Sequence, residues 1–208
     1  MKNAIEALGV PHTEIGRIEV NAGSATPDRI VREGDRIEVF PWPEVGAAPA
    51  DMPLHFVADA HLGALARFLR MLGFDTVHDN RIADAEIRRL AYHDRRIVLT
   101  RDRELLKCRE IFVGRYVRAL DPALQLEEVV ARFGLADHAN PFTLCLRCNF
   151  ALAAVEKVDV LARLPETVAR THERFHRCGG CGRIYWKGSH YARMGAALER
   201  ILHAPLDP

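Results

Sequence analysis

The sequence has no long hydrophobic run, since no stretch of it approaches the ~20 apolar residues that a membrane-spanning helix needs. Its first residues, Met-Lys-Asn-Ala-Ile-Glu, lack the apolar core of a secretory signal peptide. An excess of charge of one sign is missing as well, because 29 Lys and Arg stand against 28 Asp and Glu. These absences argue against a membrane protein and favour a cytoplasmic, reducing location. The total charge by itself indicates no partner.

The 208 residues provide room for one ordinary domain and one or two small modules. Four prolines within residues 41–53 are typical of a semi-rigid linker, and the pattern of the chain changes on either side of them. The sequence therefore predicts five segments: a small N-terminal module (1–45), a linker (46–53), a central domain (54–138), a cysteine-bearing segment (139–193) and a C-terminal tail (194–208).

The central domain alternates between short apolar strands and amphipathic helices. Strands are expected at 54–58, 75–78, 96–99 and near 111–117, with a helical pattern after each. The last helix should begin at Asp121-Pro122, a favoured N-cap followed by proline in the first helical position. Repeated strand–helix units predict an α/β fold with a parallel sheet and helices on its faces.

Cysteine is scarce, and its distribution is uneven. One of the five stands alone at Cys108, and the other four form two Cys-x-x-Cys pairs, Cys145 with Cys148 and Cys178 with Cys181. In a reducing compartment this spacing favours zinc over disulfides. A redox Cys-x-x-Cys is the alternative, but two pairs 29 residues apart are typical of a zinc ribbon.

Each cysteine pair is followed directly by a residue that tolerates a left-handed backbone, Asn149 and Gly182. Zinc knuckles often need this conformation. Four thiolates would also close the coordination sphere, so we expect a structural zinc rather than a catalytic one.

Basic residues gather around the second cysteine pair. Seven Lys or Arg stand against two Glu between residues 163 and 193, and aromatic residues lie among them. Cations can contact phosphates and rings can stack on bases, so this pattern predicts RNA contact. The residues expected to make it are Arg174, Arg183, Trp186 and Lys187. The alternative is an ordinary ribbon whose Tyr and Trp rings pack against the central domain.

Acidic residues follow the predicted strands. Asp59 and Asp102 each come directly after a strand, Asp84 begins a helix after the second strand, and Asp121 follows the fourth. Right-handed crossovers bring the carboxyl ends of parallel strands to one edge of the sheet, where carboxylates can hold Mg²⁺ or Mn²⁺. Because Asp is also a favoured N-cap, a purely structural role is the alternative for each.

Two longer segments resemble the Mut7-C ribonuclease family. They are Phe56-Val57-Ala58-Asp59-Ala60-His61-Leu62-Gly63 with the helix that follows, and Leu99-Thr100-Arg101-Asp102-Arg103-Glu104 with Leu105 and Leu106. That family combines a PIN-like, Rossmann-like nuclease domain with a zinc ribbon, and bacterial members often carry an N-terminal ubiquitin-like domain. The resemblance implies a metal-dependent ribonuclease in which Asp59 and Asp102 bind the metal. It places Asp84, or alternatively Glu86, as the third acid and Asp121 as the fourth.

Cations near the acids are candidates for phosphate binding. Arg101, Arg103 and Lys107 lie beside the proposed metal site, and Arg67 and Arg70 lie on the first helix of the central domain. The alternative for each is an ordinary solvent-exposed side chain.

The N-terminal module contains a strand pattern at Ile15 to Val20, a turn at Asn21-Ala22-Gly23 and the phrase Val-Arg-Glu-Gly-Asp-Arg-Ile-Glu-Val-Phe-Pro. That phrase resembles the end of β-grasp (ubiquitin-like) sulfur-carrier domains. The usual opening hairpin and Gly-Gly end are missing, so the resemblance covers part of the fold and implies no conjugation chemistry. A packing or partner-binding module is expected. The alternative for the whole chain is a non-catalytic RNA-binding or ribosome-associated adaptor, and the oligomeric state stays open.

Overall fold

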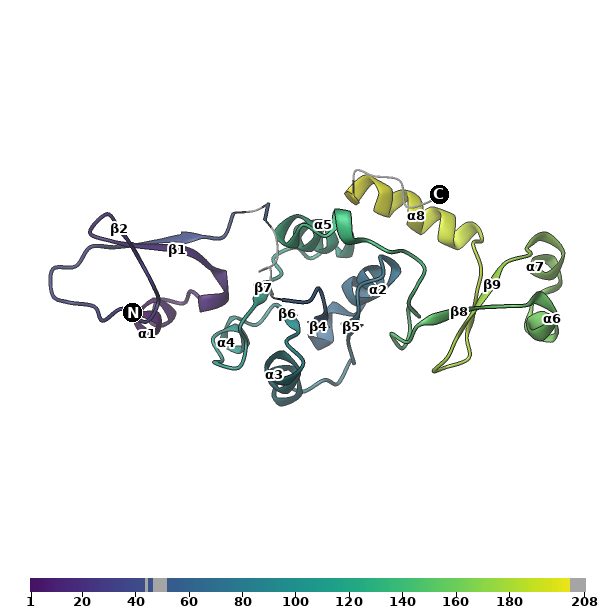
Figure 1. The fold of residues 1–208 in the computed structure, drawn as a ribbon, viewed down its shortest axis with the longest axis horizontal. Helices are drawn as coiled ribbons and strands as arrows, with labels where there is room; N and C mark the ends of the chain where they lie inside the picture. The colour runs from purple at the N-terminus through teal and green to yellow at the C-terminus, as the bar shows by residue number, and fades with distance from the viewer. Residues whose placement is uncertain (44, 47–51, 203–208) are drawn as a thin grey trace.

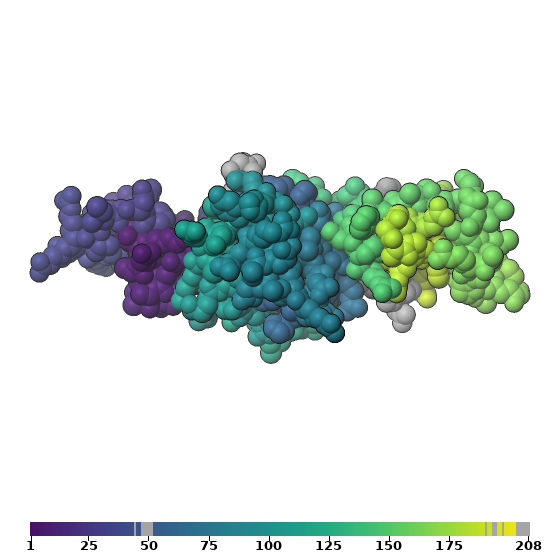
Figure 2. Space-filling view, turned by 90° about the horizontal axis from the view of Figure 1, so that it is seen from below, coloured from purple at the N-terminus to yellow at the C-terminus, as the bar shows by residue number. Residues whose placement is uncertain are grey.

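The computed structural model describes residues 1–43, 45–46 and 52–202. Three parts follow one another in a row: the N-terminal module, the central α/β domain and the cysteine-bearing ribbon (Figures 1 and 2). The predicted linker falls mostly on residues 47–51, and these lie outside the described residues. Within the described part of the chain, no helix is long and apolar enough to cross a bilayer.

The N-terminal module is a helix packed on a small antiparallel sheet of order β2-β1-β3. A two-residue turn joins β1 to β2, because Asn21 and Ala22 adopt φ angles of +54° and +65° that suit a tight hairpin. The elements are α1 (Lys2–Ala7), η1 (His12–Glu14), β1 (Ile15–Val20), β2 (Gly23–Ala25) and β3 (Ile37–Pro41). A small core of Ile5, Ile15, Ile18 and Val20 holds them together.

The central domain contains a four-stranded sheet of order β5-β4-β6-β7, and every neighbouring pair is parallel. The strands are β4 (Phe56–Ala58), β5 (Thr76–Val77), β6 (Ile97–Thr100) and β7 (Gly114–Tyr116). The helices are η2 (Ala60–Leu62), α2 (Gly63–Met71), α3 (Asp84–His93), α4 (Arg103–Leu106), α5 (Pro122–Phe133) and η3 (Ala136–His138). The predicted α/β class is confirmed.

The two faces of this sheet are covered by different helices (Figure 1). Phe56 and Leu99 lie in the larger core, with residues of α2 and α5. Val57 and Val98 point to the other face, where they meet residues of α3 and α4. Successive strand residues alternate between faces, and both faces are buried, which explains the continuous apolar character of these strands.

The ribbon has three antiparallel strands of order β10-β9-β8. Its elements are β8 (Leu152–Val155), α6 (Lys157–Val160), η4 (Leu161–Arg163), α7 (Glu166–Thr171), β9 (Phe175–Cys178) and β10 (Ile184–Tyr185). The helices α6 and α7 are inserted between β8 and β9 and lie at the far end of the molecule (Figure 1).

The chain then returns to the central domain as helix α8 (Ser189–Leu202), where the sequence predicted only a tail from residue 194. Leu198 and Leu202, one helical turn apart, are buried in the larger core, and α8 packs against α5. This tertiary packing gives the segment its helical structure. Residues 203–208 of the predicted tail lie outside the described residues.

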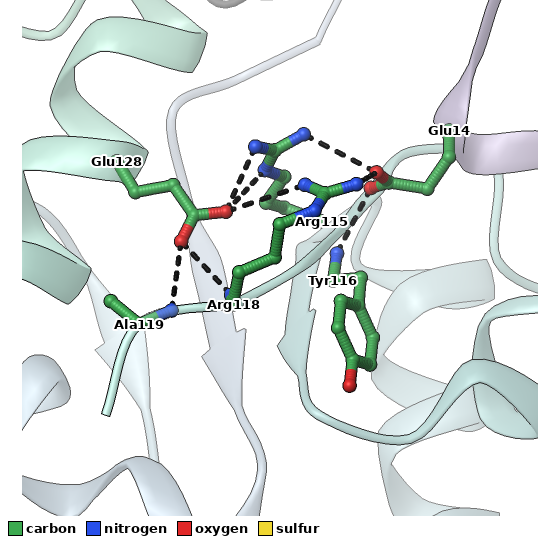
Figure 3. Close-up of polar contacts among 6 residues, drawn as sticks. All are labelled: Glu14, Arg115, Tyr116, Arg118, Ala119 and Glu128. Atoms are coloured by element: carbon green, nitrogen blue, oxygen red, sulfur yellow. Dashed lines mark hydrogen bonds and ion pairs between the residues drawn. The ribbon is translucent and has the colours of Figure 1, made fainter. Parts of the chain in front are cut away.

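Both edges of the central sheet are closed by side chains from the flanking parts. At the β7 edge, Glu14 of the N-terminal module accepts the Tyr116 N–H at 3.0 Å (Figure 3). At the β5 edge, Asn149 of the ribbon accepts the Thr76 N–H at 3.1 Å. Such unpaired strand amides would otherwise be open to another chain, so both contacts protect the sheet from edge-to-edge association.

The contact at β7 is part of a larger ionic cluster (Figure 3). Arg115 lies between Glu14 and Glu128, with Nη1 and Nη2 at 3.3 Å and 2.8 Å from their carboxylates. Arg118 Nη2 also donates to Glu14 at 2.9 Å. Both glutamates are mostly buried, so these pairs are less screened than surface salt bridges. They fix the N-terminal module on the central domain.

Candidate functional site

Asp59 and Asp102 follow neighbouring strands and are joined by one hydroxyl group. Thr100, the last residue of β6, is fully buried. Its hydroxyl donates to Asp59 Oδ2 at 2.6 Å and accepts the Asp102 N–H at 2.9 Å. The backbone adds a further link, since the Asp59 N–H donates to the carbonyl of Leu99. The carboxyl ends of β4 and β6 therefore present two acids at one edge of the sheet, where α/β folds bind their ligands.

Both acids also cap helices, as the alternative interpretation expected. Asp59 Oδ1 accepts the Ala60 N–H at 2.6 Å, and Asp102 Oδ1 accepts the Glu104 N–H at 2.7 Å. Each cap uses one carboxylate oxygen only. Asp102 Oδ2 has no hydrogen-bond partner in the described chain, and the residue is exposed. Capping therefore fixes the orientation of Asp102 and leaves an oxygen available for a cation.

The third and fourth acids differ in how they are held. Asp84 is the first residue of α3, not its N-cap, and its exposed carboxylate has no hydrogen bond or ion pair to another described residue. Its neighbour Glu86 is bound by both Nε and Nη2 of Arg89 at 2.8 Å. Asp121 caps α5 through the N–H groups of Ala123 and Leu124. Asp84 is thus the less engaged of the two candidates for the third position.

The acids do not form a closed ligand cage. Among the described residues, the four cysteines are the one group of three or more metal-ligating side chains whose ligand atoms all lie within 4.8 Å of one another. Mg²⁺ retains several waters and usually takes one or two direct carboxylates. The donor set at this edge, carboxylate oxygens with one open position on Asp102, fits such a hydrated cation.

The cations that follow β6 differ in their exposure and in whether their charge is paired. Arg101 and Arg103 are exposed, and the Arg103 guanidinium stacks over the Tyr116 ring at 4.8 Å. Lys107 Nζ lies 2.6 Å from the carboxylate of Glu104, so its charge is already paired. Arg101 and Arg103 directly flank Asp102 in the sequence. They are therefore the exposed cations next to Asp102 in the sequence, and neither forms an ion pair with another described residue.

Arg70, the other cation expected on the first helix, is mostly buried and bonded to backbone carbonyls. Its side chain is 4% exposed, and its guanidinium is used within the protein. Nε donates to the carbonyl of Thr76, and Nη1 donates to the carbonyls of Leu146 and Arg147. A buried guanidinium needs such partners, which occupy its Nε and Nη1 groups. Arg70 instead connects α2 to the first cysteine pair.

The four cysteine sulfurs form one cluster at the start of the ribbon. The Sγ atoms of Cys145 and Cys181 lie 3.7 Å apart, and those of Cys148 and Cys178 lie 3.3 Å apart. Burial raises the pKa of the Cys145 thiol, but hydrogen bonds from the Tyr185 hydroxyl and the knuckle backbone outweigh it and lower the pKa to about 6. Burial and hydrogen bonds to the neighbouring thiols raise the pKa of Cys148. Thiolate sulfur is the ligand that tetrahedral zinc prefers, so this donor set fits zinc.

The two knuckles have the same hydrogen-bond pattern. In each, the first cysteine donates its N–H to the carbonyl five residues later, Cys145 to Phe150 and Cys178 to Arg183. The residue after the second cysteine, Asn149 or Gly182, returns its N–H to the carbonyl of the first cysteine. Both of these residues have φ = +66°, as their sequence positions predicted.

The first knuckle is docked on the central sheet through a polar network at β5. Arg96 binds Asp75 with two hydrogen bonds of 2.8 Å and 3.0 Å, and Asn149 donates its amide to the same carboxylate. The side-chain oxygen Oδ1 of Asn149 accepts the Thr76 N–H. Nearby, Gly73 has φ = +89°, and a Cβ there would meet the Asn140 carbonyl oxygen at 2.0 Å. Glycine therefore lets the chain entering the ribbon pass over the end of α2.

Asp75 makes this docking sensitive to acid. Burial raises its pKa, but the hydrogen bonds from Arg96 and Asn149 outweigh that effect and leave the pKa below its ordinary value. The carboxylate therefore stabilises the folded chain above its unfolded pKa of ~3.9, and this contribution disappears as the pH falls through the folded value. We expect Asp75→Asn to lower the free energy of unfolding by ~1–2 kcal/mol at pH 7, and the difference to shrink below about pH 4.

Urea unfolding of wild type and Asp75→Asn at pH 7, 5 and 3 measures this effect. Asp137→Asn is the matched control, because Asp137 is exposed and has no hydrogen bond from its side chain within the described residues. A stability difference for Asp75→Asn that stays constant from pH 7 to pH 3 would contradict the assigned role.

The basic residues of the ribbon divide between two surfaces. Arg183 lies in a groove of about 930 Å³ that also contains Arg67 of α2. Arg174 and Lys187 instead line a separate hollow with His176. Trp186 is half-buried, lies 6.5 Å from the Phe175 ring of the ribbon and lines an apolar pocket of about 510 Å³. The sequence pattern had predicted one RNA-binding patch for all of these residues.

Three residues of the site were not predicted from the sequence. Thr100 could have been found from its position between a strand and an acid, because a strand-end hydroxyl can bond two neighbouring segments. His78 has no such pattern, and its Nε2 lies 3.1 Å from the Ala60 carbonyl beside Asp59. Arg147 lies between Cys145 and Cys148, so the sequence pattern assigned it to the knuckle and not to the basic surface.

Comparison with protein families agrees with these features. The family described as the Mut7-C RNAse domain matches residues 54–198, and the family described as Mut7-C ubiquitin matches residues 1–45. No curated protein and no solved structure matches the chain. The first match covers the parallel sheet, the acidic edge and both cysteine pairs, which is more than half of the chain. The chain belongs to the Mut7-C RNase family, with a Mut7-C ubiquitin domain at its N-terminus.

Proposed function

We propose that this protein is a metal-dependent ribonuclease that hydrolyses RNA phosphodiester bonds at the acidic edge of the central sheet. The membership in the Mut7-C RNase family supports a nuclease role. The observation that carries the proposal is the Thr100 hydroxyl, which binds Asp59 and the backbone of Asp102 at once. Capping alone would not require neighbouring strands to present two linked acids.

Asp59, Asp102 and Asp84 are the residues that would hold Mg²⁺ or Mn²⁺. The ion would neutralise charge on the phosphate and lower the pKa of a bound water. Asp102 offers Oδ2, and Asp84 offers a carboxylate without partners among the described residues. Asp121 is the fourth candidate, and Glu86 would replace Asp84 only by giving up its pair with Arg89.

The chain's own side chains orient these acids and bind the substrate. Thr100 and the Ala60 N–H each take one oxygen of Asp59, which limits rotation of that carboxylate. Arg101 and Arg103 flank Asp102 and would contact the phosphate, and Tyr116 holds the Arg103 guanidinium. Such fixed charges stabilise a transition state without reorganisation at the moment of reaction.

The flanking parts would support this activity in different ways. We infer a structural zinc on the four cysteines, which would keep the ribbon folded while Arg174, Arg183 and Lys187 contact RNA. The N-terminal module would serve packing or a protein partner, since η1 is already fixed to β7. A cytoplasmic location is consistent with cysteines that bind a metal instead of forming disulfides.

A cleavage assay with a metal titration tests the proposed function. Labelled single-stranded RNA is incubated with the full chain in metal-depleted buffer, and Mg²⁺ or Mn²⁺ is then added. We expect turnover only with the added ion, with a rate that saturates as its concentration rises. Salt-sensitive RNA binding without turnover at any ion concentration would instead identify a non-catalytic adaptor, the alternative function.

A further inference from the structure

A groove runs along the junction between α2 and the cysteine knuckles, and its volume is about 930 Å³. Its walls come from three regions that are distant in the sequence: α2, the loop after β5, and the two knuckles. Arg67 lies on the first wall, His78 and Asn80 on the second, and Arg147 and Arg183 on the third. The groove therefore exists only when the ribbon is docked on the central domain.

The groove carries charge of one sign. Arg67, Arg147 and Arg183 are exposed, and none of them forms an ion pair with another described residue. No Asp or Glu is among the described residues that line the groove. Cations left without counterions in a concave surface attract a polyanion, because low-dielectric walls strengthen the field inside.

The walls are fixed in place by buried contacts beneath the surface. Arg70 binds the backbone carbonyl of Arg147 at 2.9 Å and that of Leu146 at 3.1 Å. The knuckle that bears Arg147 is thus held against α2, and the charges of Arg147 and Arg67 stay on separate walls of one groove. A preformed site loses less conformational entropy when a ligand binds.

Hydrogen bonds link a wall of the groove to the acidic edge. His78 bonds to the carbonyl of Ala60, and the N–H of Ala60 bonds to Asp59. Gly63 is also close, since a Cβ there would lie 2.8 Å from the His78 ring. A chain of adjacent residues thus connects the Asp59 carboxylate to the groove wall.

Two half-buried rings, Phe68 and Tyr185, add apolar surface between the charges. The Tyr185 hydroxyl lies 3.1 Å from Cys145 Sγ, so this contact holds the side chain in place at the groove. Rings interleaved with cations are the arrangement that binds unpaired nucleotides, with phosphates on the cations and bases on the rings.

We propose that this groove binds a single-stranded stretch of RNA that continues from the cleavage site toward the ribbon. The inference rests on the proposed ribonuclease function and extends it, because it names the path of the substrate. It assigns this binding to Arg67, Arg147 and Arg183, and not to the basic residues that line the hollow with His176. The predicted ligand is an unpaired strand, since its bases must reach Phe68 and Tyr185.

Binding is tested by fluorescence anisotropy on the full chain in buffer without divalent ions. The probe is a labelled single-stranded RNA of about 12 nucleotides, a length within the site sizes of single-strand binding proteins. The variants are Arg67→Gln and the double variant Arg147→Gln with Arg183→Gln. Arg170→Gln is the matched control, because Arg170 is an exposed arginine of α7 outside the groove. Zinc content and circular dichroism verify that each variant is folded.

We expect the double variant to bind at least ~10-fold more weakly, and the slope of log affinity against log salt to fall by ~0.7 for each phosphate that the variant no longer neutralises. Arg67→Gln should weaken binding in the same way but less, although it lies on a different part of the fold. A duplex of the same length should bind more weakly than the single strand.

Three results would overturn the inference: groove variants that bind like Arg170→Gln, equal affinity for duplex and single strand, or complete displacement of RNA by inorganic phosphate at matched ionic strength. The last would identify a phosphate-ion site instead. Cleavage is measured separately with added Mn²⁺. Groove-dependent binding without cleavage would refute the proposed function and support the groove as a single-strand site only. Cleavage unaffected by the groove variants would support the proposed function and overturn this inference.

Discussion

Asp59→Asn is expected to lower the rate of RNA cleavage by ~10²-fold or more, with little change in the fold. The substitution removes a negative charge that would help to hold the divalent ion. A bound metal stabilises the charge of the transition state by several kcal/mol. Each ~1.36 kcal/mol of lost stabilisation lowers the rate tenfold. The amide oxygen of Asn can still accept hydrogen bonds, so one of the contacts with Thr100 and Ala60 can be kept. Loss of activity should therefore far exceed any loss of stability.

The measurement is the initial rate of cleavage under single-turnover conditions, beside the thermal midpoint of each variant. Asp102→Asn should give a similar loss, because its free Oδ2 is the other oxygen offered at this edge. Asp94→Asn is the matched control, since Asp94 follows α3 and is exposed, near the amino end of β6 and away from the acids. Cleavage by Asp59→Asn at the wild-type rate would indicate a contaminating nuclease and remove the assignment.

Cys178→Ser is expected to abolish zinc binding and unfold the ribbon. Cys178 is buried at the end of β9, and its sulfur also accepts the N–H of Cys181. Structural zinc contributes ~10–16 kcal/mol of apparent binding free energy in small finger peptides, and a ribbon with three short strands has little core to replace it. The groove between α2 and the knuckles should disappear with the ribbon.

Metal analysis should give one zinc per wild-type chain and none in Cys178→Ser. Hydrogen exchange should show fast exchange throughout residues 144–185 in the variant, and faster exchange of the Thr76 amide, whose partner is Asn149 of the first knuckle. Cys108→Ser is the control, because Cys108 lies outside the cluster and its thiol bonds to the carbonyl of Glu104. Full zinc occupancy in Cys178→Ser would show that the four cysteines do not form the site.

The sequence predicted the features that depend on local pattern. Strands buried on both faces have continuous apolar runs, and Asp121-Pro122 marked the start of α5. The spacing of the cysteines and the left-handed positions after them predicted both knuckles. The acidic edge followed from topology, because parallel strands place their carboxyl ends together.

The remaining features depend on contacts between distant residues, which leave no periodic pattern. Arg70 resembles an exposed cation of α2 until the ribbon packs over it. The groove combines Arg67 with Arg147, and these meet only because Arg70 and Asn149 dock the knuckle. The helix α8 is specified by burial of Leu198 and Leu202 against α5, so the packing partner decides the structure of that segment.

The ionic cluster around Glu14 has a consequence for protein synthesis. Glu14 precedes Arg115 by 101 residues, so its partners leave the ribosome about 5–20 s after it does at ordinary elongation rates. During that interval the N-terminal sheet can already fold, because its core residues all lie before residue 38. When β7 emerges as the edge strand of a parallel sheet, which forms slowly, the residue that binds the Tyr116 amide has already been synthesised. The N-terminal module is therefore complete in the growing chain before the strand whose edge it covers.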